Sequence, residues 1–269
     1  MNIKDIFEIK NEKPLDNLNP AVNFTGIFRT IACIGDSLSS GEFESFENDT
    51  KGYHDYYEYS WGQYMARHTG SKVYNFSRGG MNAKVYIDSF ADSKGLWSED
   101  LKSRAYIIAL GVNDVSDVLR GDIEFGSIND IDKDDCLKNK HTFAGYYAQI
   151  ISRYKKIQPK AKFFLMTLPR SFDDAPDRAA LYDKHAKLMY EFADMFNNTY
   201  VLDFRKYAPE YDEEFHKNFY LGGHLNAAGY LLTARMVESY IDYIIRHNME
   251  DFKQIGFVGT PFFNSMEKW

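Results

Sequence analysis

The chain has 269 residues, a length that suits one large domain with a sizeable buried core. Its 32 basic and 39 acidic residues give a formal net charge of -7, and no block of Lys and Arg could follow a phosphate backbone, so we expect no nucleic-acid partner. The first residues lack the apolar core and cleavage site of a signal peptide, and no stretch is long enough to span a membrane. We therefore expect a cytoplasmic protein.

Cysteine usage agrees with a reducing compartment. Cys33 and Cys136 are the only two cysteines, and they offer neither a disulfide framework nor a thiolate metal cluster. Cys33 stands inside an apolar stretch, where we expect it to act as a small core residue.

Strand-like and helical stretches alternate along the chain. The apolar runs predict strands at about 27–35, 71–77, 104–111, 161–169 and 199–204. The helical spacings between and after them predict helices at about 60–70, 141–158, 178–197 and 226–248. This alternation predicts a parallel sheet of about five strands wrapped by helices on both faces. We expect one domain over 1–269, with an N-terminal extension at 1–27 and a C-terminal tail at 249–269.

Two connecting regions are less certain in form. The Asp- and Gly-rich stretch 111–140 lacks the glycine and terminal glutamate of a calcium-binding loop, so we interpret it as solvated surface rather than a metal site. The ring-rich "YHDYYEYSW" at 53–61 is interpreted as the start of an amphipathic helix with buried rings, and alternatively as a wall for substrate.

Polar residues follow three of the predicted strands at the point where each strand ends. The first strand is followed by "GDS" with Ser37, the second by "SRGG" with Gly80, and the third by "GVND" with Asn113. Because the carboxyl ends of parallel strands share one edge of a sheet, we expect these residues to lie close together. The later "GGHLNAAGY" adds His224 just before the last helix.

These residue types suit acyl transfer. A serine needs an imidazole to accept its proton, and the developing oxyanion needs preset N–H donors from glycine backbone and a carboxamide. Each residue also has an ordinary structural interpretation: His224 or Asn113 as a cap or turn residue, and Gly80 as a residue with positive φ. Four such coincidences at one sheet edge favour a catalytic site instead.

The four motifs resemble those of the GDSL, or SGNH, family of serine esterases and lipases. The resemblance covers about residues 30–230 and implies a three-layer α/β/α flavodoxin-like domain without a cofactor. It also implies that Ser37 is the nucleophile and His224 is the base. The oxyanion hole would then be formed by Gly80, Asn113 and the Ser37 N–H.

One position departs from the family. The family commonly carries Asp three residues before the histidine, where this chain has Leu221. We therefore expect a Ser37–His224 dyad whose imidazole is oriented by a backbone carbonyl or water. Asp203, Asp212, Glu213 and Glu214 are weaker candidates to supply the missing carboxylate.

We expect hydrolysis of a small or short-chain acyl ester, such as an acetyl group on a carbohydrate, through an acyl-serine intermediate. The same site could transfer the acyl group to an alcohol, and a weakened site could serve ligand binding alone. The expected partner is a small-molecule ester; the sequence does not define an oligomeric state.

Overall fold

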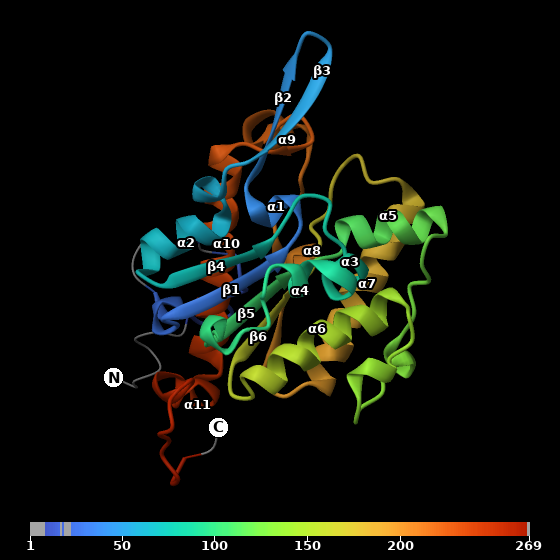
Figure 1. Ribbon diagram of the computed structural model, residues 1–269. Helices are drawn as coiled ribbons and strands as arrows, with labels where there is room; N and C mark the ends of the chain where they lie inside the picture. Colours follow the sequence, from blue (N-terminus) through green and yellow to red (C-terminus); the bar gives the residue numbers. More distant parts are fainter. Residues whose placement is uncertain (1–8, 17, 19–22, 268–269) are drawn as a thin grey trace.

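The computed structural model describes residues 9–16, 18 and 23–267 of the chain. Its central sheet has five parallel strands in the order β4-β1-β5-β6-β7 (Figure 1). The strands are β1 (Thr30–Gly35), β4 (Lys72–Ser77), β5 (Ala105–Ala109), β6 (Lys162–Met166) and β7 (Thr199–Leu202). All five strands were expected from the sequence, and the predicted α/β fold is confirmed.

Helices cover both faces of the sheet, because successive residues of a strand point to opposite sides. From β1, Ile31 and Cys33 join the core beneath α2 and α10, whereas Ala32 and Ile34 join the core beneath α6 and α7. The main covering helices are α2 (Trp61–Thr69), α6 (Phe143–Ile157), α7 (Pro176–Met195) and α10 (Ala227–His247). These helices correspond to the four that the sequence predicted.

Shorter elements complete the fold. They are α1 (Ser37–Ser40), α5 (Val112–Arg120), α8 (Phe204–Tyr207), α9 (Glu213–Phe219) and α11 (Met249–Phe252), together with α3 (Ala83–Val85) and α4 (Ala91–Ser93), which flank a π-helical stretch (Tyr86–Phe90). Short 3-10 turns lie at Phe24–Ile27, Tyr57–Tyr59, Glu99–Leu101, Ile128–Asp130, Cys136–Lys138 and Ile255–Phe257. Helix α5 therefore occupies the start of the 111–140 stretch, which the sequence left without a defined form.

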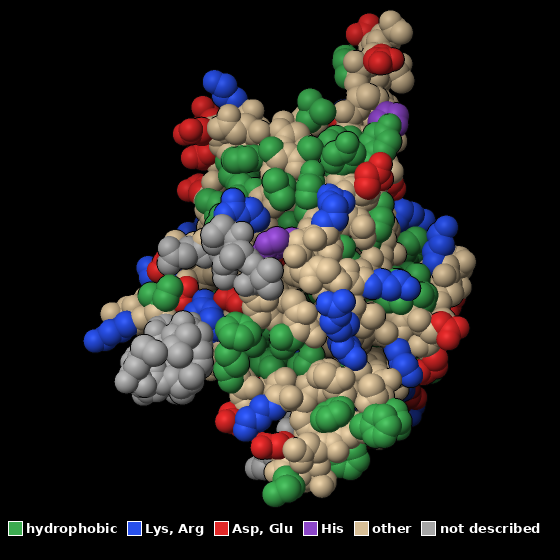
Figure 2. All heavy atoms as spheres, turned by 90° about the vertical axis from the view of Figure 1, so that its left-hand side faces the viewer, with side chains coloured by type: hydrophobic (Ala, Val, Ile, Leu, Met, Phe, Trp, Pro, Cys, Tyr) green, Lys and Arg blue, Asp and Glu red, His purple; other side chains and the backbone are tan. Residues whose placement is uncertain are grey.

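An antiparallel hairpin, β2 (Glu42–Glu47) and β3 (Thr50–Asp55), follows α1 and was not expected. Figure 1 shows it projecting beyond the carboxyl edge of the sheet, and Figure 2 shows it standing clear of the neighbouring surface. The helix expected at the start of 53–61 is wrong, because the segment continues β3 and enters a 3-10 turn. Three of its rings, Tyr53, Tyr56 and Tyr59, are exposed, whereas Trp61, which begins α2, is buried.

Part of the expected C-terminal tail packs against the core. Phe252, Ile255 and Val258, within the tail expected at 249–269, are buried beneath α10. Of the expected extension at 1–27, residues 1–8, 17 and 19–22 lie outside the described residues. One domain over 1–269 stays a prediction. No helix in the described ranges has the length and apolar character needed to cross a membrane.

Candidate active site

Strand β1 places Ser37 at the carboxyl edge of the sheet. Asp36 caps α1, and its Oδ1 accepts a hydrogen bond from the Leu38 N–H at 3.0 Å, so Ser37 becomes the first helical residue. A Cβ on Gly35 would lie 2.2 Å from the Ser39 Oγ, so the close approach of α1 to the strand end requires glycine. Ser37 is partly exposed, and its N–H has no acceptor among the described residues. The turn therefore presents a hydroxyl and a free N–H together.

The turn after β4 lies beside this nucleophile turn. The Arg78 N–H donates to the Gly35 carbonyl at 3.4 Å, which ties the two strand ends together. Gly80 adopts a φ of 69°, in the left-handed region that favours glycine. A Cβ there would meet no atom within 4 Å, and within the described ranges its N–H has no acceptor. A backbone donor is thus available in an open part of the site.

Helix α5 holds the same turn from the other side. The Asn113 Nδ2 donates to the Met81 carbonyl at 3.0 Å, and the Asp114 Oδ1 accepts from the Ala83 N–H at 2.7 Å. The first bond orients the carboxamide and uses only one of its two N–H groups. The segments that carry Ser37, Gly80 and Asn113 are therefore brought together, as the sequence predicted.

His224 lies on a short hairpin whose strands, β8 (Tyr220–Leu221) and β9 (His224–Leu225), have two residues each. Strand β9 packs against α1. The Tyr230 hydroxyl lies between α1 and β2, 2.6 Å from the Glu42 carbonyl and 3.4 Å from the Ser37 carbonyl. The structure thus places the predicted base next to the element that begins with Ser37.

The prediction that a backbone carbonyl or water orients His224 is wrong. The imidazole Nδ1 lies 2.7 Å from the Glu44 Oε1, in hydrogen-bonding geometry, and Glu44 belongs to the unexpected β2–β3 hairpin. The Nε2 lies 3.1 Å from the Glu42 Oε1, a contact outside hydrogen-bonding geometry. A carboxylate therefore does stand at the distal nitrogen, although Leu221 occupies the family's usual position.

The four acidic residues considered as replacements have other roles. Asp203 caps α8 and accepts hydrogen bonds from the Thr167 and Tyr190 hydroxyls. Asp212 caps α9, and Glu213 and Glu214 are exposed in its first turn.

Sequence reasoning missed Glu44, although a signal for its hairpin was present. The stretch "EFESFE" at 42–47 lacks the period-two pattern of a strand, because its two apolar residues, Phe43 and Phe46, are three positions apart; the signal is the turn that follows. Asn48 and Asp49 follow it, and both adopt positive φ, as in the type I′ turns that connect two-residue hairpins. The Asn48–Asp49 turn favours a hairpin, but it does not indicate that a residue of this hairpin contacts His224.

Charge at the site is set by burial and by hydrogen bonds. Burial alone would raise the pKa of Glu44, but hydrogen bonds from Lys51, the Gly223 N–H and His224 outweigh it and lower the pKa to about 2. Burial raises the pKa of Glu42. It also raises the pKa of Asp36 to about 7, against the opposing effects of the Leu38 N–H and His224. Glu44 is therefore the carboxylate that stays ionised across the neutral range.

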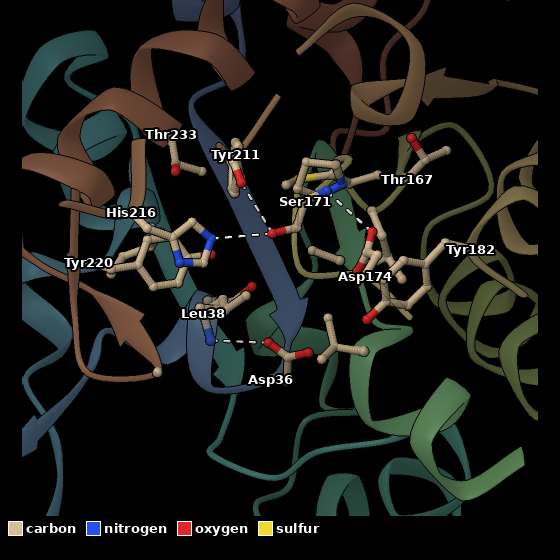
Figure 3. Close-up of a pocket in the computed structure, with 18 of the residues that line it drawn as sticks. Asp36, Leu38, Thr167, Ser171, Asp174, Tyr182, Tyr211, His216, Tyr220 and Thr233 are labelled. Carbon is tan, nitrogen blue, oxygen red and sulfur yellow. Dashed lines mark hydrogen bonds between the residues drawn. The ribbon is translucent and has the colours of Figure 1, made fainter. Parts of the chain in front are cut away.

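A cavity of about 430 Å³ opens beside these residues (Figure 3). Three of the residues that line it, Leu38, Val112 and Gly223, are direct chain neighbours of Ser37, Asn113 and His224. Figure 3 shows Asp36 and Leu38 on one side of the cavity and Ser171 and His216 pointing toward one another across it. Further lining residues are Trp61, Thr167, Asp173, Asp174, Arg178, Tyr182, Tyr211, Tyr220 and Thr233.

The cavity contains a serine–histidine contact away from Ser37. The Ser171 Oγ lies 3.2 Å from the His216 Nε2, and the same hydroxyl also contacts the Asp173 carboxylate and the Tyr211 carbonyl. Ser171 also lies outside the four motifs that suggested the nucleophile and the oxyanion donors. Over the ranges that the structure describes, no group of three or more His, Cys, Asp or Glu side chains could hold a metal ion.

The chain matches the GDSL-like lipase/acylhydrolase family over residues 33–232, a span that includes all four motifs. It therefore belongs to this family. It is a GDSL-type ester hydrolase, and its substrate class is a small-molecule ester. No curated protein matches it by sequence.

Several solved structures share the fold. A family two carbohydrate esterase from Clostridium thermocellum, in complex with cellohexaose, is 15% identical with a TM-score of 0.56, over 86% of this chain and 66% of that one. A carbohydrate esterase family 2 enzyme from Corynascus thermopiles (Myceliophthora fergusii) is 17% identical with a TM-score of 0.55, over 84% and 68%. The acetyl xylan esterase AlAXEase is 18% identical with a TM-score of 0.51, over 79% and 99%. At these identities the likeness shows the fold alone.

Proposed function

We propose that the chain hydrolyses a small or short-chain acyl ester, with Ser37 as nucleophile and His224 as general base. The observation that supports this most directly is the joining of three strand-end turns by the Arg78–Gly35 and Asn113–Met81 hydrogen bonds. These bonds gather a hydroxyl, two free backbone N–H groups and a fixed carboxamide within one small region. Acyl transfer requires that combination.

The proposed reaction has two halves. The Ser37 Oγ bonds to the ester carbonyl carbon as its proton passes to the His224 Nε2, and the carbonyl oxygen becomes an oxyanion. The N–H groups of Ser37 and Gly80 and the free amide hydrogen of Asn113 stabilise that charge. The bond to the leaving alcohol then breaks, and Nε2 gives the alcohol its proton. Water then attacks the acyl-serine carbonyl as its proton passes to Nε2. The bond to the Ser37 Oγ breaks, Nε2 returns the proton to Oγ, and the carboxylic acid departs.

The cavity bears on the substrate. Its volume of about 430 Å³ exceeds what an acetyl group needs, so it also accommodates part of the alcohol or a longer acyl chain. Rings of Trp61, Tyr182, Tyr211 and Tyr220 line it beside hydroxyl and carboxylate groups. Flat rings with nearby polar groups suit a sugar, and two neighbours of similar fold are carbohydrate esterases by name. We propose that the substrate is an acyl ester of a carbohydrate. In the acyltransferase alternative, an alcohol instead of water accepts the acyl group from Ser37.

Labelling with a fluorophosphonate probe tests the nucleophile. We expect stoichiometric modification at Ser37, because an activated serine attacks the phosphorus. Ser37→Ala should be unlabelled and should lose turnover of a chromogenic short-chain ester. The fold should stay intact, because Ser37 is a partly exposed residue at the start of α1. Ser171→Ala, which changes the serine that lies beside His216 in the cavity, should still be labelled. Absence of labelling in the native protein would favour the ligand-binding alternative, and an active Ser37→Ala would remove the mechanism.

A further inference from the structure

The β2–β3 hairpin turns one of its faces toward His224. Glu44 pairs with Tyr53 across the two strands, and residues directly opposite in an antiparallel ladder share a face. On that face the Tyr53 ring lies edge-on to the imidazole, with 6.0 Å between ring centres, and Glu44 contacts the Nδ1. The hairpin is thus a wall of the active site rather than a surface excursion.

Glu44 is tightly enclosed. Its side chain is only 7% exposed, and its Oε2 accepts from the Lys51 Nζ at 2.7 Å while its Oε1 faces His224. A Cβ on Gly222 would lie 2.4 Å from the Oε2, and one on Gly223 would lie 2.7 Å from the Oε1. The two glycines before the histidine therefore leave the space that the carboxylate occupies.

We propose that Glu44 is the positioning residue of the catalytic histidine, in place of the aspartate that the family carries where this chain has Leu221. This inference rests on the proposed function. By accepting the Nδ1 hydrogen, the carboxylate keeps the Nε2 lone pair available for the Ser37 proton, and it stabilises the imidazolium that forms during attack.

Glu42 does not fill this role, although it lies on the same face of the hairpin. Its Oε1 contacts the Nε2, the nitrogen that exchanges protons in the reaction, and that contact lacks hydrogen-bonding geometry. A Cβ on Gly79 would lie 2.1 Å from the Glu42 Oε2, so Glu42 borders the turn after β4 that carries Gly80. Leu221 is directly opposite His224 in the β8–β9 pair and is 53% exposed, without a polar group to offer.

Glu44→Gln provides the test. Lys51 can only donate, so the single carbonyl oxygen of the glutamine would face Lys51 and its NH₂ would face Nδ1. The imidazole would then carry its hydrogen on Nε2 and could not accept the Ser37 proton. We expect kcat to fall by about 10⁴-fold, the loss seen when the orienting acid of a serine protease is amidated, with KM changed little.

Glu47→Gln is the matched control, because Glu47 is exposed on the same strand and faces away from His224. It should retain the native kcat, and both variants should unfold at nearly the native temperature. A Glu44→Gln enzyme whose kcat stays within about threefold of Glu47→Gln would overturn the inference. If Ser37→Ala were itself active, the proposed function would fail instead.

A second measurement does not depend on activity or on the proposed function. In Ser37→Ala protein, an imidazole N–H hydrogen-bonded to a buried carboxylate should give a far-downfield proton resonance that correlates with the His224 Nδ1. We expect that resonance to disappear in Ser37→Ala/Glu44→Gln and to remain in Ser37→Ala/Glu47→Gln. Its presence in both would show that Glu44 does not hold the Nδ1 hydrogen.

Discussion

Asn113 and Asp114 are adjacent in the chain, and each forms a side-chain hydrogen bond to the segment that follows β4. The Asn113 carboxamide binds the Met81 carbonyl and keeps one N–H free, whereas the Asp114 carboxylate, 3% exposed, binds the Ala83 N–H. Each side chain therefore shapes the turn after β4, but only Asn113 has a donor left for substrate. In the proposed mechanism Asn113 therefore contacts substrate, whereas Asp114 acts only on the turn.

We expect Asn113→Ala to lower kcat by about 10²-fold or more with little change in KM, because the lost donor acts on charge that develops only in the transition state. Steady-state kinetics on a chromogenic ester would measure both constants, and fluorophosphonate labelling would show whether Ser37 is still reactive. A change confined to KM would make Asn113 an ordinary binding residue.

His224 and the carboxylate beside it lie on two hairpins, β8–β9 and β2–β3, that were not predicted from the sequence. In the β8–β9 hairpin, Gly222 and Gly223 form a two-residue turn, and Gly222 has a φ of 71°, as the first central residue of a type II′ turn requires. The β2–β3 hairpin then places the Glu44 carboxylate against this turn. The position of His224 thus depends on two elements packed against each other rather than on either one alone.

Gly222→Ala should disturb both elements. Its Cβ would strain a left-handed backbone position and would lie 2.4 Å from the Glu44 Oε2, so the carboxylate must shift away from the imidazole. We expect a loss of kcat of about tenfold or more, since misplacement by 1 Å can cost a hundredfold, and a loss of about 1 kcal/mol in the free energy of unfolding. Kinetics and urea unfolding would measure the two effects.

Gly256→Ala is the control for that substitution, because Gly256 has no positive φ and a Cβ there would meet no atom within 4 Å. It should leave both kcat and stability near the native values. Native kcat in Gly222→Ala would mean that the hairpin contact tolerates displacement of Glu44.

At the scale of the whole molecule, the sheet and its edge were predictable, and the packing of the two hairpins against each other was not. Strands such as β5 are continuously apolar because both of their faces are buried, so their ends, and with them Ser37, Gly80 and Asn113, could be placed from the sequence. Glu44 and His224 are 180 residues apart, and their contact depends on how two short hairpins pack. No local pattern encodes that distance, which is why the orienting acid was missed.

Two buried carboxyl groups should make the stability of the whole fold depend on pH. Asp36 and Asp114 are 2% and 3% exposed, and one oxygen of each has no hydrogen-bond partner in the part of the chain that the structure describes. Burial, with smaller effects from neighbouring groups, raises the pKa of each to about 7, and the charge of Asp36 adds to the shift of Asp114. In the unfolded chain an aspartate titrates near pH 4.

The folded state therefore binds more protons than the unfolded state between about pH 4 and pH 7, so these groups contribute stability that is full below pH 4 and is lost as the pH rises through 7. We expect the free energy of unfolding, measured in urea, to fall by at least about 1 kcal/mol from pH 5 to pH 8. Asp114→Asn keeps the oxygen that accepts the Ala83 N–H but cannot ionise, so it should flatten this fall. Asp177→Asn, at an exposed position in α7, should keep the native slope. An Asp114→Asn protein with an unchanged slope would show that Asp114 does not take up a proton on folding.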